Sequence, residues 1–281
     1  MKFMRIGDVG AERPAVLDAA GTARDISGIV ADIGPDTIET LTERLAGVDL
    51  SGLPALAVEG QRIGAPFARP RNIWCIGLNY SDHAAEAGMP VPSEPIIFSK
   101  PGSTLCGPTD PILTSPNMSK IDWEVELGIV IGTPALDIAP GTAMDHVFGY
   151  VAANDVSERV WQLERGGQWM KGKSYPSFCP CGPWLVTRDE VPDPQALGME
   201  LSVNGEVMQT GTTATMIFGV AHIVEYLSRF ALLEAGDLIV TGTPPGVGMG
   251  KKPPRYLQNG DVVEMSIEGL GAHRSPVRAR V

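Results

Sequence analysis

The chain has 281 residues, of which 43% are hydrophobic and 20% are charged, a composition typical of a globular protein with a sizeable core. Its 33 acidic residues outnumber its 22 basic residues, and the resulting net charge of −11 argues against a nucleic-acid partner, because the chain would repel phosphate backbones. The sequence contains no apolar run of the roughly 20 residues that a membrane helix needs and no N-terminal signal-peptide pattern. We therefore expect a cytoplasmic protein without membrane contacts.

The four cysteines, at positions 75, 106, 179 and 181, give little sign of chemistry. They contain no Cys-x-x-Cys spacing, and the pair at 179 and 181 lacks the second pair that would complete a zinc site. We expect reduced thiols in the core.

Residues 1–66 predict a small N-terminal α+β domain of short strands and one helix. Its expected elements are strands at residues 14–18 and 23–27 and a helix at residues 35–45, where Pro35 and Asp36 supply favoured first-turn residues. The Pro-rich residues 65–71 indicate a boundary, because each proline removes a ladder donor. Residues 67–281 then form the second predicted domain.

After a short apolar strand at residues 72–76, the sequence predicts a helix that Ser81 or Asp82 caps. His83 and Glu86 are then spaced i and i+3 on one face, where a carboxylate can orient and polarise an imidazole. A histidine that is oriented by a carboxylate in this way can act as a general base. The alternative is a surface helix on which the two residues make an incidental contact.

Two acidic residues, Glu124 and Glu126, stand two apart in an apolar run at residues 122–131 and would project from the same face of a strand. The next predicted strand ends in Asn154 and Asp155, which would add a third carboxylate. Three carboxylates make the all-oxygen ligand set that magnesium, manganese or calcium prefers. The alternative is a half-exposed strand whose acids lie in water.

The segment after Asp155 predicts one or two helical turns from Arg159 and then a glycine-rich stretch that contains Lys171 and Lys173. Lysines next to glycines, following two acidic clusters, would supply the local positive charge that an anionic substrate needs. The alternative is a solvated basic loop.

The remaining elements are architectural in this interpretation. They are a strand near residues 177–186, a hairpin at residues 201–209 with an Asn-Gly turn, an amphipathic helix at residues 217–227 with His222 and Glu225 on its flank, a strand at residues 237–241, and a last strand at residues 260–267.

The glycine-rich turn that starts at Gly242 resembles a phosphate loop only in part. Pro245 and Lys252 stand where the Walker pattern needs glycine and Ser or Thr, and the following Pro-Pro pair prevents the helix that would hold a phosphate. A hydroxyl-lined turn, with Thr241 and Thr243, describes it better.

Five ordered motifs from about residue 70 to the end of the chain resemble the fumarylacetoacetate hydrolase family. They are Gly77-Leu-Asn-Tyr with His83 and Glu86, Trp123-Glu-Val-Glu-Leu-Gly128, Asn154-Asp155-Val-Ser, Gly172-Lys173-Ser174, and Thr241-Gly-Thr-Pro-Pro-Gly-Val-Gly248. The resemblance implies a mainly β fold with some α structure, a mixed β-sandwich roll like the family's C-terminal domain, following the small N-terminal domain. It also implies a homodimer.

The resemblance implies roles for nine residues. Glu124, Glu126 and Asp155 match the family's ligands for Mg²⁺ or Mn²⁺. His83 and Glu86 match its water-activating dyad, and Lys173 matches its substrate-polarising lysine. Arg159, Gln162 and Thr243 match the residues that contact the substrate acid group.

Within the family, residues 166–187 resemble bacterial diketo-deoxy-sugar-acid hydrolases, some of which carry the name ureidoglycolate lyase. The sequence departs from many members at Tyr175 and Pro176, which bears on the substrate rather than on the metal.

The implied activity is metal-dependent hydrolysis of the C–C bond of a short 2,4-dioxo acid, of the acylpyruvate type or a diketo-deoxy sugar acid, to pyruvate and a second acid. A small anionic keto acid is the implied partner. Oxaloacetate decarboxylation or isomerisation of 2-hydroxyhepta-2,4-diene-1,7-dioate is the alternative on the same site. A non-catalytic, metal-dependent binding protein is the further alternative, and the pairing of His83 with Glu86 favours an enzyme.

Overall fold

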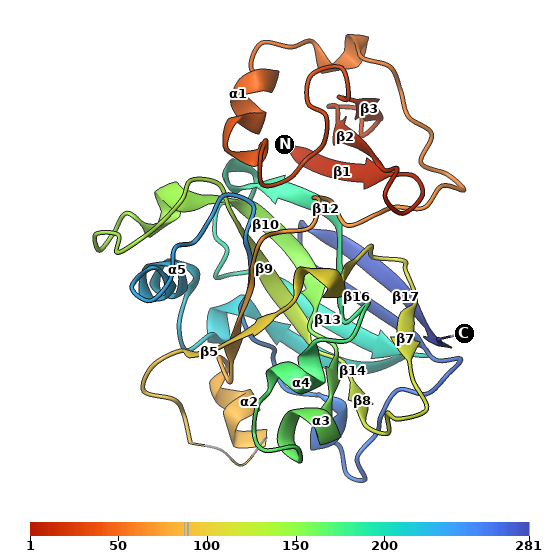
Figure 1. Cartoon of the computed structure of the whole chain (residues 1–281), viewed down its shortest axis with the longest axis vertical. Helices are drawn as coiled ribbons and strands as arrows, with labels where there is room; N and C mark the ends of the chain where they lie inside the picture. Colours follow the sequence, from red (N-terminus) through yellow and green to blue (C-terminus); the bar gives the residue numbers. More distant parts are fainter. Residues whose placement is uncertain (87, 89, 281) are drawn as a thin grey trace.

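The computed structural model describes residues 1–86, 88 and 90–280, without the side chains of residues 83–85. The fold is mainly β and contains two sheets of five or more strands (Figure 1). The larger sheet has the order β3 (Ala23–Asp25), β2 (Arg13–Leu17), β1 (Lys2–Ile6), β12 (Cys179–Thr187), β10 (Val147–Asn154), β9 (Val125–Ile131), β15 (Leu238–Val240), β4 (Ile73–Gly77) and β5 (Ile96–Lys100), and β6 (Leu105–Cys106) pairs with β12.

The second sheet has the order β14 (Glu206–Thr212), β13 (Gly198–Val203), β16 (Val262–Ile267), β17 (Gly271–Ala279) and β7 (Ile112–Thr114). A short ribbon joins β8 (Ile121–Asp122) to β11 (Ser157–Glu158). The α-helices are α1 (Leu41–Leu45), α2 (Ser81–Glu86), α3 (Arg159–Leu163), α4 (Met170–Lys173) and α5 (Val220–Ser228). Single 3-10 turns are η1 (Ile38–Thr40), η2 (Leu50–Gly52), η3 (Gly102–Thr104), η4 (Ala143–His146), η5 (Arg188–Glu190), η6 (Thr213–Thr215) and η7 (Gly248–Gly250).

The alternation of side chains along β9 separates two hydrophobic clusters. Leu127 and Ile129 point into the cluster that β9 shares with β13 and β16 of the second sheet, whereas Val130 points into a cluster on the opposite face. The two sheets therefore pack face to face, as in a β-sandwich. Glu126 alternates with Leu127, so it projects from the face opposite the sandwich core.

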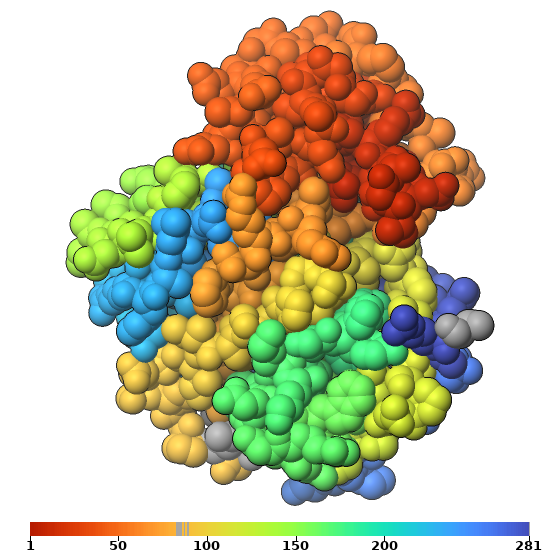
Figure 2. Space-filling model, in the orientation of Figure 1, coloured from red at the N-terminus to blue at the C-terminus, as the bar shows by residue number. Residues whose placement is uncertain are grey.

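The N-terminal strands continue the larger sheet. Lys2 pairs with Val186, which joins β1 to β12, and Phe3 enters the same cluster as Val130. Figure 1 and Figure 2 show residues 1–66 as a lobe at one end of the molecule, whereas α2, α3 and α4 lie at the other end. The boundary at residue 66 remains a prediction.

The structure corrects four details of the expected elements. The helix expected at residues 35–45 begins only at Ile38, as the turn η1 followed by α1. Lys173 lies on the short helix α4 rather than in a loop, and the strand expected to be last is followed by β17. Glu124 precedes β9, because the acidic stretch divides into β8 and β9. Among the described residues, no helix is long and apolar enough to cross a membrane.

His273 makes the stability of this fold sensitive to acid. It lies on β17 with 4% of its surface exposed, and its Nε2 lies 2.6 Å from the carbonyl oxygen of Gly182 on β12. Burial lowers its pKa to about 4 from 6.5. The unfolded chain binds the proton more tightly, so stability is lost as the pH falls from about 6.5 to about 4.

We expect His273→Gln to remove this proton-linked loss. Because one pKa unit corresponds to about 1.4 kcal/mol, the parent should lose on the order of 3 kcal/mol more than the variant between about pH 7 and pH 4. Urea unfolding at the two pH values measures the difference, with His222→Gln, at an exposed histidine, as the control. Equal losses in the parent and in His273→Gln would show that His273 titrates normally.

Candidate active site

Three carboxylates come together where β9 begins and β10 ends. Glu126 lies on β9, where it pairs with Ala153 of β10, and Asp155 follows the last residue of β10. The backbone of Glu124 is held on both sides: its N–H donates to the side-chain oxygen Asn154 Oδ1 at 3.0 Å, and its carbonyl accepts from Asp155 N at 2.9 Å. Carboxylate oxygens of the three acids lie within 4.8 Å of one another, and all three residues are buried.

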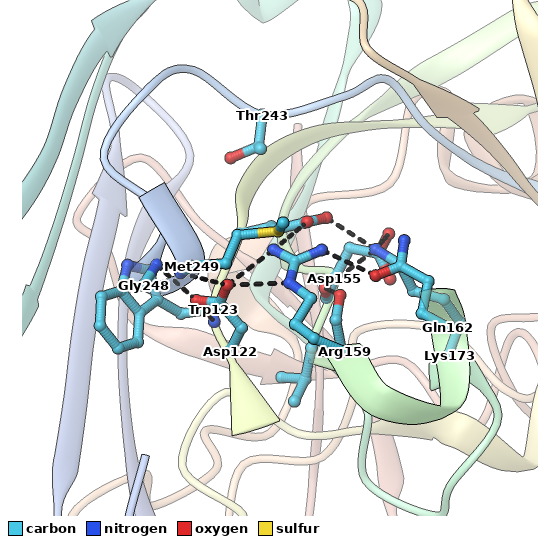
Figure 3. A network of polar contacts seen from close by, with 12 residues as sticks. Asp122, Trp123, Asp155, Arg159, Gln162, Lys173, Thr243, Gly248 and Met249 are labelled. Carbon is cyan, nitrogen blue, oxygen red and sulfur yellow. Dashed lines mark hydrogen bonds and ion pairs between the residues drawn. The ribbon is translucent and has the colours of Figure 1, made fainter. Parts of the chain in front are cut away.

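Three buried cations surround this acidic cluster, and Figure 3 labels two of them, Arg159 and Lys173. Lys173 Nζ contacts Glu124 Oε2 at 2.7 Å and Asp155 Oδ2 at 2.5 Å. Arg159 Nη2 contacts Glu124 Oε1 at 2.7 Å. Lys100, at the end of β5, donates to Asp155 Oδ1 and, at 3.2 Å, to the carbonyl of Val156. The predicted ligands Glu124 and Asp155 are thus each paired with two cations, and Lys173 contacts both of them.

A fourth carboxylate, Asp122, binds the guanidinium group of Arg159. Its Oδ2 accepts a hydrogen bond from Arg159 Nε at 2.8 Å and forms an ion pair with Arg159 Nη2, also at 2.8 Å. The same carboxylate accepts from the backbone N–H groups of Gly248 at 2.6 Å and Met249 at 3.0 Å. Asp122 therefore ties the glycine-rich turn to the guanidinium group.

The electrostatics of the cluster follow from its burial. Burial raises the pKa of Glu126, and the nearby Asp155 and Glu124 raise it further, well above its usual value. Burial alone would lower the pKa of Arg159 and Lys173. Their carboxylate neighbours outweigh that effect and hold both pKa values above the usual range, so both side chains stay charged at neutral pH.

Glu126 differs from the other acids of the cluster in its partners. Among the described residues it has no ion pair, and its Oε2 accepts a hydrogen bond of 2.8 Å from the backbone N–H of Gly242. A buried carboxylate without a cationic partner is costly, because burial removes its hydration. With Glu124 and Asp155 beside it, it completes three hard oxygen ligands, so the side chains fit a divalent cation such as Mg²⁺ or Mn²⁺.

The acidic cluster opens into a cavity of about 300 Å³. The residues around it come from β4, β5, α2, α3, α4 and the glycine-rich turn: Ile76, Gly77, Leu78, Glu86, Phe98, Glu124, Glu126, Asp155, Arg159, Gln162, Leu163, Trp169, Lys173, Gly242, Thr243, Val247, Met249 and Gly250. Eight of the nine residues predicted from the sequence thus line one cavity.

The ninth residue, His83, lies on α2, but its side chain is outside the described part of the structure. Its expected partner Glu86 is in place: the carboxylate accepts from the N–H of Gly246 at 3.0 and 3.2 Å. A Cβ atom at position 250 would lie 2.6 Å from Glu86 Cδ, so Gly250 leaves the space that this side chain occupies. The turn thus holds Glu86 at the wall of the cavity.

Gln162 and Thr243 also lie at the cavity, each with an internal partner. Gln162 Oε1 accepts from Arg159 Nη1 at 2.9 Å, which leaves its amide nitrogen for other contacts. The Thr243 hydroxyl donates to the carbonyl of Val125 at 2.9 Å and accepts from Gln209 Nε2 at 2.8 Å. Figure 3 shows Thr243 apart from the network of ion pairs.

The glycine-rich turn is attached to the end of β9 by its hydroxyl groups. The Thr241 hydroxyl donates to Leu127 O at 2.9 Å, in the same way that Thr243 reaches Val125. Gly242 has φ +96°, and an added Cβ would lie 2.7 Å from Asn79 Cβ, so glycine is required where its N–H meets Glu126. The turn is a backbone donor to carboxylates, not a phosphate loop.

The sequence alone did not assign roles to Lys100, Asp122 or Gln209. Lys100 ends an apolar strand, a position compatible with either solvent or the site, and Asp122 is one of three acids in five residues. Gln209 lies in the hairpin strand β14, and its side chain reaches across to the backbone N–H of Val125 at 3.0 Å. Only the packing of distant segments reveals these contacts.

The sequence and the fold both match known proteins. The family model described as fumarylacetoacetate (FAA) hydrolase, C-terminal, matches residues 72–278. A relative from Burkholderia multivorans, named only provisionally as a hydrolase, is 53% identical over 281 residues, or 99% of each chain.

Three solved structures show the same fold over the whole chain. Fumarylacetoacetate hydrolase from Exiguobacterium antarcticum is 41% identical with a TM-score of 0.87, and each chain is covered to 100%. Maleylpyruvate hydrolase from Sphingobium sp. SYK-6, in complex with manganese (II) and pyruvate, is 27% identical with a TM-score of 0.83 and the same coverage. The 2-hydroxyhepta-2,4-diene-1,7-dioate isomerase from Mycobacterium marinum is 34% identical, with a TM-score of 0.79 and coverage of 100% and 99%. The chain therefore belongs to the fumarylacetoacetate hydrolase family, whose members are enzymes.

Proposed function

We propose that this protein is a divalent-metal-dependent hydrolase that cleaves the C–C bond of a short 2,4-dioxo acid to pyruvate and a second acid. The observation that carries the proposal is the shared cavity: the buried carboxylates Glu124, Glu126 and Asp155 lie on it together with the cations Lys173 and Arg159. A solved relative in complex with manganese (II) and pyruvate supports both the metal and the product.

Glu124, Glu126 and Asp155 would hold the metal, Mg²⁺ or Mn²⁺. The bound cation would polarise the carboxylate and 2-keto oxygens of the substrate and offset the repulsion among the three carboxylates. Lys100 and Lys173 orient Asp155, since their ammonium groups contact its two oxygens.

The remaining side chains fit the parts of a hydrolytic cleavage. Water adds to the C4 carbonyl, the C3–C4 bond breaks, and its electron pair moves to C3, which then takes a proton to give pyruvate. We assign the removal of the proton from water to His83, oriented by Glu86. Lys173 would stabilise negative charge on the reacting oxygen, and Arg159, Gln162 and Thr243 would contact the acid group of the substrate.

The same site could support decarboxylation of oxaloacetate or isomerisation of a dienedioate, because both need stabilisation of an enolate but no attacking water. An assay of the purified protein with Mg²⁺ against acylpyruvates, diketo-deoxy sugar acids, oxaloacetate and a hydroxy-dienedioate tests the choice. Release of pyruvate together with a second acid supports hydrolysis, and carbon dioxide or isomerised product alone contradicts it. Metal binding without any turnover would indicate a binding protein.

The first prediction concerns Glu126. Glu126→Gln keeps the oxygen that accepts from Gly242 but removes the negative charge, so Mg²⁺ should no longer stabilise the fold. At a hundredfold excess over its dissociation constant, the metal should stabilise the parent by about 2.7 kcal/mol and the variant by much less. Thermal unfolding with and without Mg²⁺ measures this.

The control for that prediction is Glu264→Gln, the same change at a partly exposed acid on β16. Without metal, Glu126→Gln should be at least as stable as the parent, because it removes a buried carboxylate whose pKa is raised. An undiminished Mg²⁺ effect in Glu126→Gln would contradict the proposed ligand set.

The second prediction compares two lysines of one helix. Lys173 is buried against Glu124 and Asp155, whereas Lys171 is exposed and donates to the carbonyl of Arg165. Lys173→Met should lower kcat for a 2,4-dioxo acid by about a hundredfold or more, the usual effect of losing one charge-stabilising donor. Lys171→Met should change it little. Steady-state kinetics decides, and equal effects in both variants would remove Lys173 from the proposed mechanism.

The third prediction separates hydrolysis from enolate chemistry. His83→Ala should lower hydrolysis of a 2,4-dioxo acid by on the order of a hundredfold or more, the size of a general-base effect, while metal binding persists. Any decarboxylation of oxaloacetate should fall much less, since it needs no nucleophilic water. His222→Ala serves as a matched control. Equal losses in the two reactions would assign His83 another role.

A further inference from the structure

The lining of the cavity is apolar in part. Among its apolar side chains are five that we call the apolar wall: Leu78, Phe98, Leu163, Trp169 and Met249. This apolar wall begins beside the reacting groups, because Lys173 Nζ lies 5.2 Å from the centre of the Phe98 ring. A substrate held at Lys173 would therefore lie beside Phe98 of the apolar wall.

The position of Trp169 in the apolar wall is fixed by its neighbours. Its ring packs edge-on against Phe98, with 5.5 Å between the ring centres. On the other side it lies against Gly77 at the end of β4, where an added Cβ would come within 2.3 Å of Trp169 Cζ3. Glycine at position 77 thus leaves room for the indole ring, and the wall is a built surface rather than a flexible edge.

Among the described lining residues, no cation is left for a second acid group of a substrate. The described lining contains four carboxylates, from Glu86, Glu124, Glu126 and Asp155, and two cations, from Arg159 and Lys173. Both cations already form ion pairs, with Glu124 in common. A divalent ion would balance the lining, and without one the lining is net negative. In either case a carboxylate at the apolar wall would lose hydration without gaining a partner.

From these observations we infer that the acyl arm of the substrate, beyond C4, is uncharged and largely apolar, so that the enzyme prefers alkyl or aryl acylpyruvates to substrates with a second carboxylate. This inference rests on the proposed function, because it places the first acid group and the 2-keto oxygen at the acidic cluster. It narrows the substrate class, since dicarboxylates and heavily hydroxylated arms would both face apolar side chains.

A matched pair of substrates tests the inference. Succinylpyruvate carries a carboxylate at the end of its acyl arm, and its analogue has an isopropyl group of similar size in that place. We expect kcat/KM for the isopropyl compound to exceed that for succinylpyruvate by about tenfold or more, the discrimination that an apolar pocket achieves against an unpaired polar group. Equal values, or a preference for the dianion, would overturn the inference.

A pair of compounds that cannot be cleaved separates this inference from the proposed reaction. Oxamates bearing the same two arms on nitrogen keep the carboxylate and the adjacent carbonyl but lack the C3–C4 bond. Calorimetric titration with Mg²⁺ present should give about a tenfold or greater preference for the isopropyl arm. If the isopropyl oxamate binds more tightly but no dioxo acid is turned over, hydrolysis is refuted and the apolar arm is upheld. If the dioxo acids are turned over but the dianionic oxamate binds more tightly, hydrolysis is upheld and the apolar arm is refuted.

A substitution at the rim of the apolar wall should reverse the preference. Leu163 is 44% exposed on α3, so Leu163→Arg can place a cation at the wall without burying its charge. The ratio of kcat/KM for succinylpyruvate to that for the isopropyl compound should rise about tenfold or more. Leu232→Arg, at a residue 47% exposed and outside the described cavity lining, adds the same charge and should leave the ratio unchanged. A similar rise in both variants would show that net charge, not the wall, sets the preference.

Trp169→Ala removes the largest side chain of the wall. It should lower kcat/KM for the isopropyl compound more than for acetylpyruvate, whose arm is a single methyl group too short to use the wall fully. Equal reduction for both substrates would show that Trp169 supports the fold of α4 and does not contact the arm.

Discussion

The compensation of buried charge around Asp155 and Glu124 is the constraint on which the rest of the site depends. Three carboxylates, Asp122, Glu124 and Asp155, and three cations, Lys100, Arg159 and Lys173, form this one buried network of ion pairs. Removing one partner of a buried ion pair typically costs about 3–5 kcal/mol, because the other charge stays buried without compensation. Each charge of the network is therefore compensated only when its partners are present, so the segments that carry these residues must pack together in the folded protein.

The β-sandwich provides the rigid framework that brings these segments together. Hydrogen bonds between β9 and β10 place Glu126 opposite Ala153, and the contacts of Glu124 with Asn154 Oδ1 and with the backbone N–H of Asp155 close the end of the pair. Except for the Asn154 side chain, these are backbone contacts and do not depend on side-chain rotamers. The glycine-rich turn then adds N–H donors to Asp122, Glu126 and Glu86, so that three acids on different segments are oriented by one loop.

The cavity joins two environments that require different substrate groups. In the proposed function, a divalent ion at the acidic cluster would favour an anionic, chelating head group, and the ion pairs that already hold Arg159 and Lys173 would limit their reorganisation. Along the apolar wall, the aromatic pair of Phe98 and Trp169 excludes water and offers no partner for charge. The reacting C3–C4 bond of a dioxo acid would lie between the two, where low polarity strengthens each electrostatic contact.

The family fold, the β-rich character and the site segments could be predicted from the sequence, because they depend on local patterns. Alternating apolar residues, the Asn-Gly turn of the hairpin and the spacing of the motifs around Glu126 and Lys173 are properties of short stretches. The element ends were less predictable: Glu124 was expected on the same strand as Glu126, but the backbone leaves the strand between Asp122 and Val125 to reach Asn154.

Only the tertiary structure decided which charges meet. Lys100 and Asp155 are 55 positions apart, and Asp122 and the N–H of Gly248 are 126 positions apart, so no local pattern relates them. The same holds for the apolar wall, where Gly77 matters because it leaves room for a tryptophan 92 residues later in the chain. The sequence by itself determined the kinds of groups available and the strands that carry them. The pairing of those groups was decided by sheet register and packing, because burial makes each charge depend on partners that the chain brings in from elsewhere.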